Sequence, residues 1–439
     1  MAKHFDIVVV GAGILGAAAA FHLQKNSPRR RILLVDRFPS PGQGNTGRSN
    51  AMFRNTFTSL DNQVLSDSTI EYYLHLQEAM GADIGLQRIG YLWLMSGRQL
   101  SASEKALEGM ARQGIEVQRL SKEDLRAKIP GMAASLAGDG QAKLMALPEV
   151  EGGAFGPKCG RLDPDKLVRH YVGGFLGMGG RVAFNTSAEK LLLGPDKRLG
   201  IEGEPFAWQD YRVEGIHAAG ALNGEVATDT VVLACGAWGN ELMGPAGLDG
   251  HVSAKKRQLF SVSAKGSKAL EELMHAKGFN PLGVLPMTIL PKGGVHFKPV
   301  AEEGDFWMGS EDEANRPFIH VPDRDLGAYL GEPEFYERSV NPVVSTYFPA
   351  FRNARAKAMW AGLYSYNTVD YIPFVFRQAG VITVGGDSGS GIMKGDALGR
   401  IVDAVYRGEE EALLYGGERY RTSKLGFESR DVEREEWVI

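Results

Sequence analysis

The sequence has little of what marks several large classes of protein. Its 439 residues include two cysteines, Cys159 and Cys235, which exclude a disulfide scaffold and are typical of a reducing cytoplasm. The formal net charge is −4, from 49 basic and 53 acidic residues, so the basic surplus of a nucleic-acid-binding protein is missing. The nine histidines form no HExxH motif and no paired Cys/His set, so we expect no metal site.

Long hydrophobic runs are also missing. No apolar stretch approaches the ~20 residues that a membrane-spanning helix needs, and no signal-like segment precedes the first apolar run at Ile7. We therefore expect a cytoplasmic protein of two or three lobes, without a transmembrane segment. The sequence leaves open both homo-oligomerisation and peripheral association with the inner face of a membrane.

A dinucleotide-binding turn is present near the start of the chain. Residues 7–16 read Ile-Val-Val-Val-Gly-Ala-Gly-Ile-Leu-Gly, which predicts a buried strand leading through glycines into a helix. Gly11 allows a tight turn, Gly13 lets the backbone approach a pyrophosphate, and Gly16 lets the helix lie close to the strand. The helix N-terminus would bind the pyrophosphate through its free N–H groups. Asp36, which ends a second apolar run at residues 32–35, is expected to bind the adenosine ribose.

Two distant segments favour a flavin over a nicotinamide. Residues 42–50, Gly-Gln-Gly-Asn-Thr-Gly-Arg-Ser-Asn, offer small donors to an extended pyrophosphate and ribityl chain. Near the C-terminus, residues 381–384 predict a strand, and Gly-Gly-Asp-Ser-Gly-Ser-Gly-Ile-Met-Lys at 385–394 leads into another helix. The N-terminus of that helix would stabilise the negative charge that a reduced flavin collects at N1–C2=O.

These segments, with Val-Val-Leu-Ala-Cys-Gly-Ala-Trp at 231–238, resemble the D-amino-acid oxidase/sarcosine oxidase (DAO) superfamily of FAD enzymes over almost the whole chain. The resemblance implies an α/β (α+β) fold: a Rossmann-like FAD-binding domain with an interleaved antiparallel-sheet substrate-binding domain. We assign residues 1–85, 155–240 and 355–439 to the discontinuous FAD-binding domain and residues 86–154 and 241–354 to the substrate-binding domain.

Five strings are more specific. Gly-Arg-Ser-Asn-Ala-Met-Phe-Arg at 47–54, Gly-Ile-Glu-Gly-Glu-Pro at 200–205, Trp-Ala-Gly-Leu-Tyr at 360–364, Gly-Ser-Gly-Ile-Met-Lys at 389–394 and Leu-Tyr-Gly-Gly-Glu at 414–418 are similar to the archaeal homomeric dye-linked L-proline dehydrogenases. The similarity implies oxidation of L-proline at C5 to 1-pyrroline-5-carboxylate, with hydride transfer to flavin N5 and electrons passed to a dye or quinone-type acceptor. Two alternatives stay open: an oxidase or dehydrogenase of sarcosine, hydroxyproline or another secondary amine, and a flavoprotein subunit or assembly factor without turnover.

The residues expected to bind the cofactor lie on these segments. They are Gly11, Ala12, Gly13, Ile14, Leu15, Gly16, Asp36, Arg37, Gly47, Arg48, Ser49, Asn50, Ala51, Met52, Ala188, Ala234, Gly236, Trp238, Gly389, Gly391, Ile392, Met393 and Lys394.

The resemblance also implies a carboxylate clamp. In sarcosine oxidase-type enzymes an arginine and a lysine at what look like the places of Arg54 and Lys394 hold the substrate carboxylate, which suits a bidentate guanidinium and a second cation. The alternative for Arg54 is a structural ion pair. The alternative for Lys394 is contact with the flavin alone. Tyr364 and Tyr91 are the aromatic candidates for the wall of the substrate pocket, and Trp93 and Tyr366 are further candidates. The alternative for each is that it is an ordinary residue of the hydrophobic core.

Two departures from sarcosine oxidase are informative. Those enzymes attach the flavin covalently through a cysteine in the C-terminal third, whereas residues 361–369 here contain none, so we expect non-covalent FAD. They also carry a lysine over the flavin that assists the reaction with oxygen. The corresponding strand here is taken as residues 306–309, which would place Trp307 or a neighbour at that point and favours a dehydrogenase.

The remaining elements are predicted more coarsely. We expect helices over 62–80 and 102–113, helix starts at 121–124 and 161–166, and hairpins between 193 and 224. Strands are expected at 88–95, 181–184, 258–263, 295–299 and 306–309. The charge-dense tail, 429–436, predicts a solvated end, with docking of Trp437 on a neighbour as the alternative.

Overall fold

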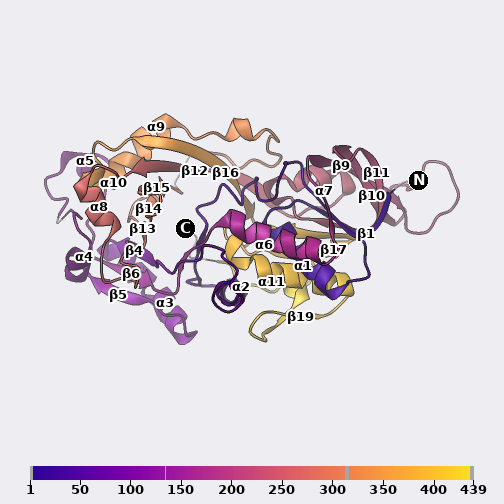
Figure 1. Cartoon of the computed structure of the whole chain (residues 1–439), viewed down its shortest axis with the longest axis horizontal. Helices are drawn as coiled ribbons and strands as arrows, with labels where there is room; N and C mark the ends of the chain where they lie inside the picture. The colour runs from indigo at the N-terminus through magenta and orange to yellow at the C-terminus, as the bar shows by residue number, and fades with distance from the viewer. Residues whose placement is uncertain (1–2, 134, 312–315, 436–439) are drawn as a thin grey trace.

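Two large sheets organise the chain, and they lie toward opposite ends of the molecule in Figure 1. The computed structural model describes residues 3–133, 135–311 and 316–435. In the first sheet the order is β17–β18–β11–β1–β2–β8, and β10 and β9 extend it from β11. Its strands are β1 (Lys3–Val10), β2 (Ile32–Val35), β8 (Arg181–Ala183), β9 (Thr186–Pro195), β10 (Tyr211–Gly220), β11 (Gly224–Leu233), β17 (Phe374–Gln378) and β18 (Val381–Gly385).

The centre of this sheet is parallel. Strand β1 pairs in parallel with β2 and β11, β2 with β8, and β11 with β18. The carboxyl ends of parallel strands lie at the same edge, where open α/β sheets bind their ligands. Gly11, Asp36, Ala234 and Gly386, each of which directly follows one of these strands, are therefore brought together.

Four helices accompany the first sheet: α1 (Ile14–Asn26), α2 (Leu60–Glu78), α6 (Pro164–Gly177) and α11 (Gly395–Arg407). Helix α1 packs against both α6 and α11. Its alanines, Ala17 to Ala20, are completely buried because small side chains let neighbouring helices approach closely. Asp163 caps α6 through hydrogen bonds to its first turn, as the Asp-Pro start predicts.

The second sheet has the order β16–β12–β15–β14–β13–β4–β6–β5, with antiparallel pairing except between β13 and β4. Its core includes Phe297, Phe306, Phe348 and Phe351. The strands are β4 (Tyr91–Met95), β5 (Gln118–Ser121), β6 (Gly152–Gly156), β12 (Val252–Ser263), β13 (Met287–Ile289), β14 (His296–Val300), β15 (Asp305–Gly309) and β16 (Ala356–Asn367). The predicted pairing of a Rossmann-like sheet with an antiparallel one is confirmed.

Shorter elements complete the described chain. The remaining α-helices are α3 (Gly97–Arg112), α4 (Lys122–Lys128), α5 (Gly140–Leu144), α7 (Asn240–Met243), α8 (Lys268–Met274), α9 (Pro333–Phe335) and α10 (Asn341–Tyr347). The small sheets pair β3 (Met52–Phe53) with β7 (Gly160–Arg161) and β19 (Glu411–Leu413) with β20 (Arg419–Arg421). No helix within the described ranges is long and apolar enough to cross a bilayer.

Most predicted elements exist, with shifted ends. The helix expected over 62–80 spans Leu60–Glu78, because the Ser59 side chain accepts a hydrogen bond from Asn62 N and starts the helix earlier. The helix expected over 102–113 begins at Gly97, where Ser96 and Gln99 form a capping box. Strand β16 lies in the second sheet, although we assigned residues 355–367 to the FAD-binding domain. The division into domains remains a prediction, and the position of β16 would move residues 356–367 into the substrate-binding domain.

The charged tail is only partly solvated over its described residues, of which Ser429, Asp431, Glu433 and Arg434 are exposed. Arg430 forms a salt bridge to Asp370 with Nε to Oδ2 at 2.5 Å. Glu435 is 4% exposed, and its carboxylate accepts hydrogen bonds from Ser59 N at 3.1 Å and Asn62 Nδ2 at 3.0 Å. The expectation of a solvated end is therefore wrong at Arg430 and Glu435, because charged residues become buried when fixed partners satisfy them. Trp437 lies outside the described residues.

Candidate active site

The turn after β1 brings three strands and a helix into close contact. Gly11 has φ +101°, and a Cβ there would lie 2.5 Å from Ala234 O. A Cβ at Gly16 would lie 1.8 Å from Gly11 O, so α1 begins directly against the turn. Gly11 N donates to Val35 O at 2.9 Å, which fixes the turn to β2. The glycine spacing therefore has the close packing that the sequence predicts.

Asp36 lies at the end of β2 and faces this turn. Its Oδ2 accepts a hydrogen bond from Ala12 N at 2.6 Å, and its Oδ1 accepts one from Phe38 N at 2.9 Å. Burial raises the pKa of the Asp36 carboxyl above its usual value. Next to it, the Arg37 guanidinium lies 4.4 Å from the ring centroid of Trp238, while its buried Nη2 has no hydrogen-bond partner in the described chain.

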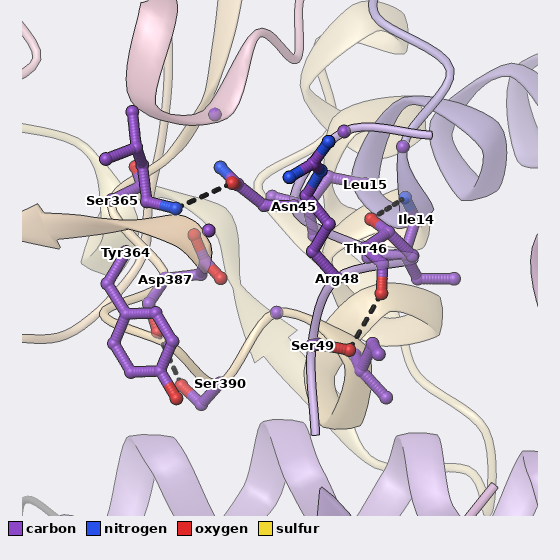
Figure 2. Close-up of a pocket in the computed structure, with 18 of the residues that line it drawn as sticks. Ile14, Leu15, Asn45, Thr46, Arg48, Ser49, Tyr364, Ser365, Asp387 and Ser390 are labelled. Atoms are coloured by element: carbon purple, nitrogen blue, oxygen red, sulfur yellow. Dashed lines mark hydrogen bonds between the residues drawn. The ribbon is translucent and has the colours of Figure 1, made fainter. Parts of the chain in front are cut away.

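The segment 42–50 connects α1 to the second sheet (Figure 2). Thr46 Oγ1 accepts a hydrogen bond from Ile14 N at 3.1 Å, and Asn45 Oδ1 accepts one from Leu363 N at 2.8 Å. Arg48 Nη1 donates to Ala361 O at 3.0 Å, and Trp360 Nε1 donates back to Arg48 O at 3.0 Å. The 42–50 segment is thus hydrogen-bonded to β16.

The second glycine-rich segment follows β18 and ends in a short 3-10 turn at Ile392–Lys394 before α11. Gly389 has φ +84°, and a Cβ there would lie 2.2 Å from the Tyr364 ring. Figure 2 shows that ring beside Ser390, across the cavity from the 45–49 segment. Gly389 is therefore required both by its backbone conformation and by the ring packed over it.

Arg54 and Lys394 converge on one aromatic ring. The Arg54 guanidinium lies 4.1 Å from the centroid of Phe57, and the Lys394 ammonium lies 4.8 Å from it. Lys394 is completely buried, and its Nζ donates to Asn62 Oδ1 at 2.5 Å and Ser390 Oγ at 2.6 Å. Burial lowers the pKa of Lys394 to about 7, with Arg54 acting in the same direction.

One cavity connects these parts. It is lined by most of the predicted cofactor residues and by Arg54, Tyr91 and Tyr364 of the predicted catalytic set. Ala12, Gly16, Gly47 and Lys394 are outside its lining and support the wall from behind: Lys394 contacts it through Ser390 and Asn62. The predicted cofactor residues that do line it are Gly11, Gly13, Ile14, Leu15, Asp36, Arg37, Arg48, Ser49, Asn50, Ala51, Met52, Ala188, Ala234, Gly236, Trp238, Gly389, Gly391, Ile392 and Met393.

Of the aromatic candidates, two line the cavity and two lie behind its wall. Tyr91 and Tyr364 line the cavity, and burial raises the pKa of Tyr364 to about 12, so its phenol keeps its proton at neutral pH. Trp93 stacks on Tyr91 with ring centroids 5.3 Å apart, outside the lining. Tyr366 also lies behind the wall, where its hydroxyl accepts a hydrogen bond from Arg257 Nη2 at 2.7 Å.

Several charged residues of the cavity escaped sequence reasoning. Arg257, His296, Glu311 and Glu435 all line it, from β12, β14, the end of β15 and the tail. None belongs to a motif, and their positions are separated by tens of residues. Only the folded chain brings them together, so the sequence carried no local signal for them.

The structure does not place Trp307 where the sequence predicted it. Trp307 does not line the cavity but packs edge-on against Trp360, with ring centroids 4.9 Å apart. Its cross-strand partner is Lys298, which is 2% exposed and donates from Nζ to Asn50 O at 2.5 Å. A buried lysine on the neighbouring strand therefore contacts the 42–50 segment, although Lys298 also lies outside the cavity lining.

The two ends of the cavity suit the two halves of FAD. Asp36 and the unpartnered Arg37 Nη2 offer an acceptor and a donor where the adenosine would lie. Glycines without room for a Cβ let the backbone approach a pyrophosphate. At the other end, Ala51, Met52 and residues 389–393 leave a wall of small and apolar groups for a flat ring. The described residues contain no group of three or more His, Cys, Asp or Glu that could hold a metal ion.

The chain belongs to the DAO family of FAD-dependent oxidoreductases, because the family's model, FAD dependent oxidoreductase, matches residues 6–404. The predicted resemblance is thereby confirmed, and the family implies FAD as the cofactor. Among curated relatives, FAD-dependent oxidoreductase domain-containing protein 1 of Xenopus laevis is 23% identical over 416 residues, covering 90% of this chain and 78% of that protein. Monomeric sarcosine oxidase of Bacillus sp. (strain B-0618) is 23% identical over 251 residues, covering 57% and 55%.

Solved structures show the same fold. L-proline dehydrogenase from P. horikoshii aligns with a TM-score of 0.71 and 21% identity, covering 93% of this chain and 95% of that one. Glycine oxidase from Geobacillus kaustophilus aligns with a TM-score of 0.69 and 18% identity, covering 93% and 96%.

Proposed function

We propose that this protein is an FAD-dependent dehydrogenase of small amino acids, with L-proline as the first candidate substrate and 1-pyrroline-5-carboxylate as its product. The observation that carries the proposal is Arg54, a guanidinium that lines the same cavity as Tyr91 and Tyr364, beside the segments suited to a flavin. Bound FAD would accept a hydride from the carbon next to the substrate nitrogen.

The chain's own residues would orient the substrate. Arg54 would bind the carboxylate, and Tyr91 and Tyr364 would close over the ring and exclude water. Lys394, behind Ser390 and Asn62, would support this grip electrostatically rather than by direct contact. Since a fixed carboxylate determines which ring carbon faces the flavin, the clamp would also select the bond that is oxidised.

A dye or quinone-type acceptor is part of the proposal, and the second candidate is an oxidase of sarcosine or another secondary amine. Lys298 specifically favours that candidate, because it is a buried cation against the flavin-side segment. Stopped-flow mixing without oxygen should show bleaching of the flavin by L-proline, and weaker bleaching by D-proline and sarcosine. Absence of bleaching by any amine would point to a flavoprotein without turnover.

The acceptor is tested by comparing two products. With L-proline under air, we expect dye reduction to exceed peroxide release by about tenfold or more, since a dehydrogenase reoxidises slowly with oxygen. Lys298→Met tests the lysine that favours the oxidase candidate. This variant should change the rate of peroxide release more than the rate of dye reduction. Equal rates of peroxide release and dye reduction in the wild-type protein would identify an oxidase.

Non-covalent binding of FAD is the second part of the proposal. Burial raises the pKa of the Cys235 thiol to about 12 and that of Cys159 to about 11, so both remain protonated and unreactive. Acid precipitation is therefore expected to leave the yellow cofactor in the filtrate. Cys235 is the one cysteine among the described residues that lines the cavity. Cys235→Ser should release the same amount of yellow cofactor into the filtrate as the wild-type protein. Colour retained in the wild-type pellet would show a covalent link.

A further inference from the structure

Glu311 lies in the cavity at a place that the carboxylate clamp does not explain. It follows β15 after Ser310 and lines the same cavity as Arg54 and Tyr364. Gly294 makes room for it: a Cβ at that glycine would lie 2.9 Å from Glu311 Cβ and 3.0 Å from its Cγ. The side chain thus packs against the turn before β14.

Glu311 differs from the other carboxylates of the cavity because they are all engaged. Asp36 accepts hydrogen bonds from Ala12 N and Phe38 N, and Glu241 pairs with Arg324 Nε. The Asp387 carboxylate is held by backbone N–H groups of its own turn, including that of Gly391. Glu435 accepts four hydrogen bonds from the segment 58–62. Glu311 makes no hydrogen bond, and no ion pair within 4 Å, with any residue that the structure describes.

Glu311 is surrounded by cationic and other titratable side chains. Charged and titratable groups face it from β12, β16, β4, β14 and the segment after β3: Lys255, Arg257, Tyr364, Tyr366, Tyr91, His296 and Arg54. The cations favour the carboxylate, whereas burial opposes it more strongly and raises the pKa of Glu311 to about 7. A group with this pKa can both carry a negative charge and accept a proton near neutral pH.

The other candidates for proton acceptance are weaker. Burial lowers the pKa of His296 to about 4, and its Nδ1 already donates to Gly294 O at 2.9 Å. The phenols of Tyr91 and Tyr364 have pKa values raised by burial and keep their protons. This leaves one carboxylate that is both unengaged and basic enough among the described residues that line the cavity.

We propose that Glu311 binds the protonated amine of the substrate and accepts its proton before oxidation. This inference rests on the proposed function and extends it. The ammonium R₂NH₂⁺ gives one proton to the Glu311 carboxylate, leaving R₂NH and a neutral carboxyl group. The adjacent carbon then loses hydrogen with its electron pair to the bound flavin, the oxidant, and the nitrogen lone pair forms the C=N⁺ bond of the iminium product. Substrates are therefore amino acids with a basic amine, held between Arg54 and Glu311.

The test is the pH dependence of anaerobic flavin reduction by L-proline in Glu311→Gln. At pH 7 the second-order rate of reduction is expected to fall by about 100-fold or more. Near pH 10, where solution supplies unprotonated amine, the deficit should shrink to below about tenfold. Glu303→Gln replaces an exposed carboxylate in the turn between β14 and β15, and this matched control should follow the wild-type profile.

A binding measurement separates amine recognition from damage to the site. Tetrahydro-2-furoate has an ether oxygen in place of the amine, so Glu311→Gln should bind it at least as tightly as the wild-type protein does. Its binding is followed by the change in the flavin spectrum, which also shows that FAD is retained. The measurement is repeated with Glu311→Ala, because the introduced glutamine could form a new hydrogen bond and the alanine cannot.

The outcomes are distinguishable. If L-proline reduces both proteins equally at every pH, or if the deficit of Glu311→Gln is the same at pH 7 and pH 10, Glu311 has no role in proton transfer and the inference fails while the proposed function stands. If no amine reduces the wild-type flavin, the proposed function fails and the inference fails with it.

Discussion

Replacing Arg54 by methionine is expected to raise the L-proline concentration for half-maximal flavin reduction by about 100-fold or more. Loss of one partner from a buried, charge-assisted contact costs about 2–5 kcal/mol, and each ~1.4 kcal/mol is a factor of ten. Arg54 is suited to this role because its guanidinium is fixed in place: its Nη1 donates to Thr56 O, and Phe57 packs 4.1 Å from it. Stopped-flow reduction over a range of L-proline concentrations measures the effect.

Arg48→Met is the matched control, since both arginines line the same cavity. Arg48 connects the 42–50 segment to Ala361, so its loss should weaken FAD binding and leave the half-saturating L-proline concentration of the loaded enzyme nearly unchanged. Arg54→Lys should recover part of the lost affinity, because it keeps the charge without the bidentate geometry. Loss of FAD from Arg54→Met, with unchanged response to L-proline in the remainder, would assign Arg54 to the cofactor site instead.

Gly16→Ala is expected to weaken FAD binding by about 10- to 100-fold and to lower the thermal midpoint. The new Cβ would lie 1.8 Å from Gly11 O, so α1 must move away from the turn and carry its N–H groups with it. Overpacking of this kind costs about 1–3 kcal/mol or more. FAD titration followed by fluorescence, and thermal unfolding of the holoprotein, give the two effects separately.

Gly173→Ala provides the comparison for the same chemical change. Gly173 lies inside α6, is exposed, and has nothing within 4 Å of a built Cβ. Alanine there should stabilise the helix by about 0.5–1 kcal/mol and leave FAD binding unchanged. If Gly16→Ala behaved like Gly173→Ala, close contact between α1 and the turn would not be what binds the cofactor.

The cofactor end of the site could be predicted well because its residues are consecutive. Gly11, Gly13 and Gly16 act through the local path of the backbone, and the strand before them and the helix after them have their own sequence patterns. The capping residues Ser96, Ser121 and Asp163 act within one turn for the same reason. Helix ends were less certain where a side chain, such as that of Ser59, decides between neighbouring start points.

The substrate end depended on which strands pair. Trp307 was expected over the flavin side, but it lies outside the cavity lining, and the register of β14 against β15 sets the buried Lys298 opposite it. Glu435 was expected in solvent and is buried against the segment 58–62, which lies more than 370 residues away in sequence. Such pairings carry no local signal.

The sequence by itself determined the family, the dinucleotide and the glycine-bearing turns, because these rest on short backbone paths and on helix termini. Only the tertiary structure decided which charges meet in the cavity. Arg54, Arg257 and Glu311 come from three separate segments: the pairing of β12 with β15 brings Arg257 and Glu311 to the cavity, and Arg54 reaches it from the segment after β3. Interactions between distant residues exist only after the chain has closed the loops between them, and that closure is a property of the whole fold.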